Sequence, residues 1–375
     1  MVISSLSSGG AERVATTLAN HWAEQGHTIT LITFAGTDKD FYTLSPEVRR
    51  IALNVAGDSR GAADALRGNI IRVKALGRAL KQEAPDIALG FMHKSNILCG
   101  LACAGTGIFA IGSEHIHPPM ASLGQPWSAL RRLVYPRLAA VSALTPQSAS
   151  WIESETHARR VPVIPNPIAY PIPDSDSSVD PGTLKNRLEG DKLLLAVGRL
   201  TYQKAFDRLL SAFQRLHDGH PDWHLVILGE GPLREELERY RAELGLETAV
   251  AMPGAVGNIG AWYEAADAYV MTSRFEGFGN TLAEALAHGV PAVAVDCETG
   301  PGTILRHDVD GLLVPKDDLE ALVAALDHLM GDTALRDRFR AAAVEARDRF
   351  AVATIAGQWE DVFATVRDGT AYRGD

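Results

Sequence analysis

The sequence has few cysteines and no long uninterrupted apolar segment. Only Cys99, Cys103 and Cys297 occur among 375 residues, too few for a disulfide framework, and they lack the pairing of a zinc site. We therefore expect small core residues in a reducing compartment. The longest apolar stretch, residues 97–112, is interrupted by glycines and falls short of the roughly 18 residues that suggest a membrane span. These absences exclude a disulfide scaffold and a membrane-spanning helix.

An excess of positive charge and a targeting signal are also missing. The formal net charge is −10, which disfavours nucleic-acid binding. The N-terminus has no cationic region followed by an apolar core, so we expect a cytoplasmic protein. Residues 1–170 carry 16 Lys and Arg against 12 Asp and Glu, whereas residues 171–375 carry 20 against 34. The basic first half predicts peripheral contact with an anionic membrane, on its inner face.

Length and pattern predict two α/β domains. A chain of 375 residues with 46% hydrophobic content can bury two cores. Residues 164–173 are punctuated by prolines and residues 174–180 are polar, so this segment is predicted to be a hinge. Apolar strands alternate with turns and amphipathic helices on both sides of it, which predicts parallel, doubly wound sheets. The predicted strands are residues 2–5, 28–34, 87–91, 110–113 and 137–141, then 193–197, 225–228, 250–254, 268–271 and 291–296.

Two carboxylates, Glu276 and Glu284, flank a glycine-containing loop between the apolar strand 268–271 and a helix. Gly277 and Gly279 let backbone N–H groups approach a ligand, and the following helix N-terminus favours negative charge. The arrangement suits a sugar nucleotide. The structural alternative is that Glu276 is a solvated loop acid and that Glu284 only complements the helix dipole.

Two cations, Arg199 and Lys204, follow the predicted strand 193–197. Ligands of open parallel sheets bind outside the carboxyl ends of the strands, where an Arg and a Lys can neutralise a diphosphate. Ordinary surface charge is the alternative.

These motifs, taken in order, resemble the retaining, GT-B-fold glycosyltransferases of glycosyltransferase family 4. The resemblance rests on Gly198-Arg199, Lys204, Gly229-Glu230-Gly231-Pro232, Glu276-Gly277-Phe278-Gly279 and Glu284. It covers nearly the whole chain, and residues 113–118, 130–133 and 163–167 are similar to the branch that builds exopolysaccharide, capsule or O-antigen. The resemblance implies two Rossmann-like doubly wound parallel-sheet domains, residues 1–167 and 168–353, facing each other across a cleft. It also implies that a last helix, residues 354–375, packs back on the first domain.

The resemblance implies roles for individual residues. Arg199 and Lys204 would hold the donor diphosphate, Glu284 the ribose and Glu276 the transferred sugar. The other implied contacts to the nucleotide sugar are Gly9, Gly10, Glu230, Gly277, Phe278, Gly279 and Asn280. His115 matches the family's first-domain histidine near the sugar, although a structural histidine is the alternative. Ala205 stands where the family usually has glycine, and it would strain the loop if this position requires positive φ.

The implied function is transfer of a hexose or N-acetylhexosamine from a UDP-sugar, or from a GDP-sugar, to a lipid-linked glycan acceptor in cell-surface polysaccharide biosynthesis. The first domain would bind the acceptor and the second the nucleotide sugar, with retention at the anomeric carbon and no metal or other cofactor. A sugar-nucleotide epimerase or hydrolase of the same fold, and a non-catalytic sugar-nucleotide-binding subunit, are the alternatives. A dinucleotide oxidoreductase is disfavoured because residues 7–11 lack the G-x-G-x-x-G spacing. The acidic pairs Asp38/Asp40 and Asp174/Asp176 do not closely follow an apolar strand, so they predict no metal site.

Two basic amphipathic helices are predicted in the first half. Residues 60–81 place Leu66 and Ile70 on one face and cations on another, a pattern that fits an anionic lipid surface or packing on the protein's own sheet. Residues 127–137 place Trp127 beside Arg131 and Arg132. The arginines there are candidates for the phosphate of a lipid-linked pyrophosphate acceptor, and the tryptophan for its isoprenoid.

Overall fold

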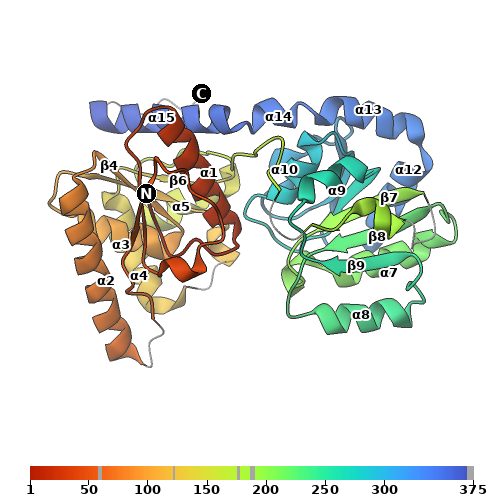
Figure 1. Ribbon diagram of the computed structural model, residues 1–375, viewed down its shortest axis with the longest axis horizontal. Helices are drawn as coiled ribbons and strands as arrows, with labels where there is room; N and C mark the ends of the chain where they lie inside the picture. Colours follow the sequence, from red (N-terminus) through yellow and green to blue (C-terminus); the bar gives the residue numbers. More distant parts are fainter. Residues whose placement is uncertain (58–60, 121–122, 175–177, 186–190, 370–375) are drawn as a thin grey trace. The chain divides into compact units, whose positions relative to one another are not determined.

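The computed structural model describes residues 1–57, 61–120, 123–174, 178–185 and 191–369 (Figure 1). The chain forms two compact units. The N-terminal unit contains residues 1–167 and the C-terminal helix from Val352, and the C-terminal unit contains Ile168–Ala351. The boundary between the two units, after residue 167, therefore falls inside the proline-punctuated segment 164–173.

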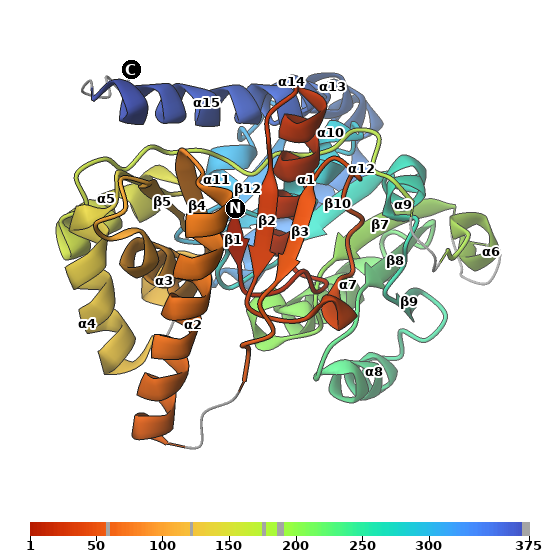
Figure 2. The same ribbon diagram turned by 60° about the vertical axis from the view of Figure 1, so that its left-hand side comes forward.

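A six-stranded parallel sheet forms the centre of the N-terminal unit, in the order β3-β2-β1-β4-β5-β6 (Figure 2). Its strands are β1 (Val2–Ile3), β2 (Thr30–Thr33), β3 (Arg49–Ala52), β4 (Ile87–Phe91), β5 (Phe109–Ser113) and β6 (Ala140–Ser142). The chain reverses its direction of winding between β1 and β4, which lie side by side. This is the topological switch point of a doubly wound sheet.

Helices cover both faces of this sheet. They are α1 (Gly10–Glu24), α2 (Ala62–Glu83), α3 (His93–Cys103), α4 (Gly124–Val134), α5 (Pro146–Thr156) and α15 (Val352–Asp368), with the 3-10 turns η1 (Thr37–Lys39), η2 (Pro118–Met120) and η3 (Tyr135–Arg137). On one face α15 lies against α1, where Trp22 and Trp359 share a core with Ile3 (Figure 1). On the other face α2 and α3 pack around Leu76 and Ile97. Successive strand residues point to opposite faces, so β1 contributes Val2 to this second core.

The C-terminal unit repeats the architecture with a parallel sheet in the order β12-β11-β10-β7-β8-β9. Its strands are β7 (Lys192–Val197), β8 (Trp223–Leu228), β9 (Val250–Gly254), β10 (Ala268–Met271), β11 (Ala292–Asp296) and β12 (Gly311–Pro315). Its switch point lies between β7 and β10. The predicted fold class, α/β with two doubly wound parallel sheets, is confirmed.

The helices of the C-terminal unit again follow the strands. They are α6 (Pro181–Lys185), α7 (Phe206–His217), α8 (Arg234–Glu243), α9 (Ile259–Ala265), α10 (Asn280–Ala287), α11 (Pro301–Ile304), α12 (Leu319–Gly331), α13 (Thr333–Ala343) and α14 (Ala346–Arg349), with the 3-10 turn η4 (Tyr202–Lys204). The apolar stripe of α7 buries Leu209 and Phe213 in a core shared with Leu326 of α12 and Leu194 of β7. This packing fixes the start of α7, and with it the loop that leaves β7.

Two strands, β3 and β12, are absent from the sequence-based prediction, and both lie at a sheet edge. The first begins with Arg49 and Arg50, and the second begins with Gly311 and ends with Pro315. Edge strands tolerate charged residues and proline because one side needs no hydrogen-bond partner. The apolar pattern that marks a buried parallel strand is therefore weak in both.

The sequence allowed the apolar face of α2 either to pack on the protein's own sheet or to remain free for a lipid surface, and the structure divides the helix between the two. Its C-terminal half packs on the sheet, since Leu76 and Leu80 are buried. Its N-terminal half extends beyond the sheet (Figure 2), where Leu66 is 65% exposed and Ile70 and Ile71 are also exposed. The predicted apolar face is thus divided between the protein core and solvent.

Candidate active site

Residues predicted to bind the donor meet at the switch point of the C-terminal unit. Arg199 and Lys204 follow β7, and Glu276 follows β10, the strand paired with β7. The carboxyl ends of two neighbouring parallel strands lie together, and a switch point leaves a crevice there for a ligand. The topology therefore joins charges that are more than 70 positions apart in sequence.

Glu276 is held by several side chains. The ammonium of Lys204 lies 2.6 Å from Glu276 Oε1, and Ser273 Oγ donates to the same oxygen at 2.6 Å. Gln203 anchors the loop by donating to the Phe275 carbonyl at 3.0 Å. The side chains of Lys204 and Glu276 are only 16% and 8% exposed. The Coulomb attraction within an ion pair so shielded from water is stronger than within a surface pair.

Two glycines make this arrangement possible. A Cβ on Gly198 would lie 2.9 Å from Cε of Lys204, so the lysine stem lies directly against the backbone of Gly198. Gly300 has φ +100°, and a Cβ there would lie 2.2 Å from the Phe278 carbonyl oxygen. The loop at Gly300 thus approaches the Glu276 segment more closely than other residues allow, while Gly198 lies against the stem of Lys204.

Ala205, directly after Lys204, adopts φ 53° and ψ 40°, the left-handed region. The sequence indicated strain here if the position required positive φ, and the structure has that positive φ. The alanine is fully buried, so packing keeps it in a conformation that L-residues disfavour.

Glu284 lies inside α10 and is 2% exposed. Its Oε2 accepts a hydrogen bond from the hydroxyl of Tyr263 at 3.0 Å. Helix α10 begins after Gly279, whose φ is +112°. The predicted strand, glycine turn and helix at 268–288 are confirmed. Tyr263 was not identified from sequence, because it precedes Glu284 by 21 positions with no motif between them.

The remaining predicted donor contacts differ in their surroundings. Arg199 is exposed, and within the described residues its side chain has no hydrogen bond or ion pair. Glu230 forms a two-point ion pair with Arg234, with both N···O distances 2.7 Å. Phe278 is 2% exposed and its ring packs edge-on against Phe350 at 5.5 Å, so its backbone, not its ring, is available to a ligand.

Gly9, Gly10 and His115 belong to the N-terminal unit. Gly9 precedes α1, and Glu12 lies so close that a Cβ on Gly9 would be 2.1 Å from its carboxylate. His115 Nε2 lies 3.0 Å from Ser113 Oγ, and its ring stacks on Phe91 at 5.3 Å. Burial lowers the pKa of His115 to about 4, so the imidazole is neutral at pH 7.

The two predicted phosphate-binding arginines of α4 have different environments. Arg132 is exposed and lies 3.5 Å from Glu155. Arg131 is only 7% exposed, and its guanidinium stacks on Trp151 at 4.6 Å. Trp127 is half-buried, with the Lys94 ammonium 5.7 Å from its ring.

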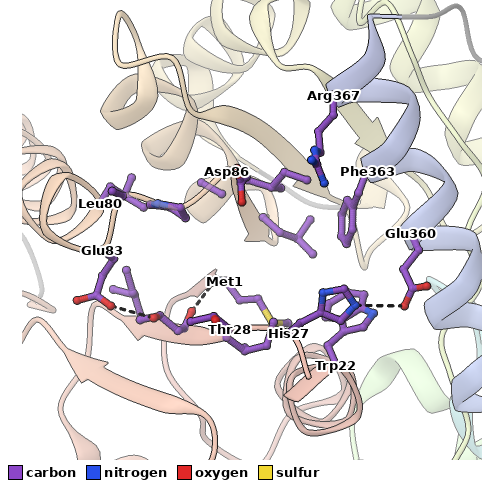
Figure 3. Close-up of a pocket in the computed structure, with 18 of the residues that line it drawn as sticks. Met1, Trp22, His27, Thr28, Leu80, Glu83, Asp86, Glu360, Phe363 and Arg367 are labelled. Atoms are coloured by element: carbon purple, nitrogen blue, oxygen red, sulfur yellow. Dashed lines mark hydrogen bonds and ion pairs between the residues drawn. The ribbon is translucent and has the colours of Figure 1, made fainter. Parts of the chain in front are cut away.

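A cavity of about 620 Å³ lies at the amino ends of the N-terminal unit's strands (Figure 3). Met1, Thr30 and Asp86 line it from the sheet, and Phe363 and Arg367 of α15 line it from the other side. Open α/β sheets bind ligands at the carboxyl edge. This cavity is therefore at the edge opposite to His115.

The described residues contain no cluster of three or more His, Cys, Asp or Glu side chains placed to hold a metal ion. Of the acidic pairs, Asp40 is bound to Arg50 at 2.9 Å, and Asp176 lies outside the described residues. All three cysteines are buried and free, as predicted. Among the helices that the structure describes, none has the length and apolarity needed to cross a membrane.

The sequence matches two family models. Residues 184–346 match the family described as Glycosyl transferases group 1, and residues 8–169 match the one described as Glycosyltransferase Family 4. The family 4 match ends two residues after the boundary between the units, and the group 1 match lies within the C-terminal unit.

Known proteins are similar over the whole chain or part of it. A GalNAc-alpha-(1->4)-GalNAc-alpha-(1->3)-diNAcBac-PP-undecaprenol alpha-1,4-N-acetyl-D-galactosaminyltransferase from Campylobacter jejuni is 31% identical over 372 residues, 98% of each chain. An exopolysaccharide phosphotransferase from Streptomyces coelicolor is 36% identical over 231 residues, which cover 61% of this chain and 23% of that protein. The solved structure of Anabaena HepE in complex with UDP has a TM-score of 0.75 at 18% identity, covering 97% of this chain and 98% of that one. This last likeness concerns the fold.

Proposed function

The chain belongs to the group 1 and family 4 glycosyltransferases, and from this premise we propose that it transfers a hexose or N-acetylhexosamine from a UDP-sugar to a lipid-linked glycan with retention of configuration. The product would be an intermediate of cell-surface polysaccharide biosynthesis. A GDP-sugar is the second candidate donor. No metal ion takes part in the proposed reaction.

The observation that carries this proposal is the buried Lys204–Glu276 pair at the switch point of the C-terminal unit. An ammonium has three N–H donors, and Glu276 occupies one of them. Two donors remain for diphosphate oxygens, while the carboxylate faces the sugar that the diphosphate carries. In this proposal one ion pair positions both the diphosphate and the sugar, the two groups joined by the bond that breaks.

Charge development explains the other residues. When the bond between the anomeric carbon and the phosphate breaks, the diphosphate gains negative charge and the sugar gains positive charge. Arg199 and Lys204 stabilise the first, and the carboxylate of Glu276 lies close to the second. Glu284, held by Tyr263, binds the ribose hydroxyls. In the proposed front-face attack, the departing phosphate accepts the proton of the acceptor hydroxyl.

His115 serves as an uncharged hydrogen-bonding group in this scheme. Its pKa of about 4 keeps the ring neutral at the pH of the cytoplasm, and Ser113 at 3.0 Å orients it. A neutral imidazole can bind a sugar hydroxyl without adding positive charge beside an emerging oxocarbenium ion.

A lipid-linked acceptor is supported by the name of the Campylobacter relative, whose substrate carries PP-undecaprenol, and by α2. The N-terminal half of α2 exposes Leu66, Ile70 and Ile71 beside Arg67 and Lys74. Apolar side chains flanked by cations suit the surface of an anionic membrane. We propose that this half-helix holds the enzyme at the membrane that contains its acceptor. Leu66→Ser with Ile70→Ser should then reduce sedimentation with anionic vesicles; unchanged sedimentation would contradict this role of α2.

The reaction is tested by screening UDP- and GDP-sugars for thermal stabilisation and then measuring transfer from the stabilising donor to lipid-linked glycans. NMR of the product gives the anomeric configuration. Glu284→Ala should lower transfer at least about 100-fold, while Glu264→Ala, an exposed acid on α9, should behave as wild type.

The outcomes separate the proposal from its alternatives. Donor turnover without any acceptor would indicate an epimerase or hydrolase. Donor binding without turnover under any condition would indicate a non-catalytic subunit. Full activity of Glu284→Ala would contradict the proposed site.

A further inference from the structure

Arg131 of α4 is a buried cation whose guanidinium stacks on Trp151 at 4.6 Å but lacks hydrogen-bond acceptors for two of its nitrogens. Only 7% of the residue is exposed, and its Nε and Nη1 atoms are buried and form no hydrogen bond. Within the described residues no carboxylate lies within 4 Å of the guanidinium. Two guanidinium nitrogens that have lost their water and gained no acceptor are unfavourable, a cost that stacking on Trp151 offsets only in part.

The charge of Arg131 acts on the buried acid Glu114. Glu114 is buried and accepts a hydrogen bond from the Tyr135 hydroxyl. Burial raises the pKa of Glu114 to about 7, opposed by Tyr135, by the charge of Arg131 and by Asn96. With a pKa of about 7 this carboxyl group is protonated in about half of the molecules at pH 7, so it compensates the charge of Arg131 only in part.

The first turn of α3 lies beside α4, since the Lys94 ammonium is 5.7 Å from the Trp127 ring, and this turn is itself positive. No side chain caps α3, and its first turn contains no acid, so its N-terminal N–H groups and the positive end of its dipole are free for an anion. His93 opens the helix with a buried Nδ1 that lacks a hydrogen bond. Burial and the charges of Lys94 and Arg131 lower the pKa of His93 to about 4.

The position of this cluster within the fold is that of a ligand site. Helix α3 follows β4, which borders the switch point of the N-terminal unit. Its start is fixed because Asn96 donates to the Ser113 carbonyl at 3.1 Å and accepts from the Ser113 N–H at 3.2 Å. Ser113 also contacts His115. The cluster is therefore one strand away from the proposed catalytic histidine.

We propose that the first turn of α3, with Lys94 and Arg131, is a subsite for a phosphate group of the acceptor. Lys94 supplies a mobile ammonium from solvent, Arg131 supplies a fixed guanidinium held on Trp151, and the helix supplies backbone N–H groups. The phosphate provides the acceptors that Arg131 and His93 lack. This inference rests on the proposed transferase function only for the identity of the ligand that carries the phosphate.

A binding experiment tests the subsite without any activity. Inorganic pyrophosphate is titrated by calorimetry into ligand-free wild type, Arg131→Met and Arg132→Met. The same three titrations are repeated with proteins that also carry Lys204→Met. Pyrophosphate binding that persists in the Lys204→Met background should be weakened at least about tenfold by Arg131→Met. Arg132→Met, which alters the adjacent exposed arginine, should bind as wild type. Equal binding by all three proteins would overturn the proposal.

A second readout is independent of the folding of the arginine variant. In wild type, pyrophosphate bound at α3 should raise the pKa of His93, which NMR follows through the ring carbon signals, because the anion offsets the neighbouring cations. Lys94→Gln, an exposed substitution, should reduce this shift. A His93 titration that pyrophosphate leaves unchanged would overturn the subsite.

Kinetics then identify the source of the phosphate. Arg131→Met should raise KM for a diphosphate-linked acceptor at least about tenfold, and leave KM unchanged for the same glycan on a phosphate-free alkyl chain. Equal effects on both acceptors would overturn the assignment to an acceptor phosphate. If no acceptor receives sugar, the proposed function fails, while the pyrophosphate titrations still decide the subsite.

Discussion

The switch points of the two sheets have the same topology but opposite electrostatic states. In the C-terminal unit the buried acid Glu276 is bound to Lys204 at 2.6 Å and to Ser273. In the N-terminal unit the buried Arg131 has two nitrogens without a partner, next to a helix start that no acid compensates. The buried charge of the C-terminal unit is therefore paired without a ligand, whereas that of the N-terminal unit lacks hydrogen-bond acceptors.

This difference fits the roles that we propose for the two sites. A paired acid keeps its geometry before the ligand arrives, which suits a group that must orient a reacting sugar. An unpaired buried cation gains the most when an anion arrives, which suits a group that discriminates acceptors by their phosphate. Breaking the pair in one unit and removing the lone cation in the other should therefore change stability in opposite directions.

The largest effect is expected from Lys204→Met, which leaves Glu276 buried with no cation. We expect a loss of about 3–5 kcal/mol in the free energy of unfolding of the C-terminal unit and loss of transfer. Adding Glu276→Gln should restore part of the stability but none of the activity. Lys192→Met, at the other end of β7, removes an exposed ion pair with Asp222 and serves as control. Urea unfolding measures all four proteins, and a stable Lys204→Met would contradict the importance of the pair.

The next effect is a pH dependence from Glu114. Its folded pKa of about 7 exceeds its usual 4.5, so between these values the folded protein binds more protons and stability falls as pH rises. The shift corresponds to about 3 kcal/mol. His93 and His115, with pKa values of about 4, act in the opposite direction, because their folded forms bind fewer protons up to pH 6.5.

Glu114→Gln isolates the carboxyl group, since both histidines remain. From pH 4.5 to 8 the wild type should lose about 3 kcal/mol relative to the variant, as measured by urea unfolding at each pH. Parallel curves for the two proteins would show that Glu114 has an ordinary pKa, and Arg131 would then have a charged neighbour.

The sequence was sufficient to predict the arrangement of the C-terminal site because its motifs are local. Gly277, Gly279 and Glu284 lie within one strand–turn–helix unit, and its strand and helix follow from apolar patterning. Parallel topology then places the loop after β7 beside the loop after β10. The contacts of Tyr263 and Gln203 were not predictable, because they depend on tertiary packing between segments with no common motif.

The charge state of the N-terminal site could not be predicted from its sequence. Arg131 and Arg132 are neighbours in an amphipathic helix, and sequence alone assigned both to phosphate. A helix turns by about 100° per residue, so consecutive residues point in different directions. The structure places one against Trp151 and the other against Glu155 in solvent.

A smaller effect, with the opposite sign to that of Lys204→Met, is expected from Arg131→Met without ligand. The variant removes an unpaired buried charge and retains most of the apolar volume, so we expect a gain of about 1 kcal/mol in unfolding free energy. Arg132→Met should change stability by less than about 0.5 kcal/mol. A loss of stability in Arg131→Met, by urea unfolding in phosphate-free buffer, would show that stacking of the guanidinium on Trp151 outweighs the cost of its burial.

The smallest effect concerns the backbone, where the C-terminal site does carry strain. Ala205→Gly should relieve the left-handed conformation, by about 1 kcal/mol, and should lose a buried methyl group, by about 0.8 kcal/mol. The two terms nearly cancel, so we expect unfolding free energy within about 0.5 kcal/mol of wild type. Ala212→Gly is the matched control, because Ala212 is equally buried but lies inside α7, where both helix propensity and methyl burial are lost, at about 2 kcal/mol. Equal losses of unfolding free energy in the two variants would show that Ala205 is unstrained. The C-terminal switch point would then have an unstrained backbone as well as a paired charge.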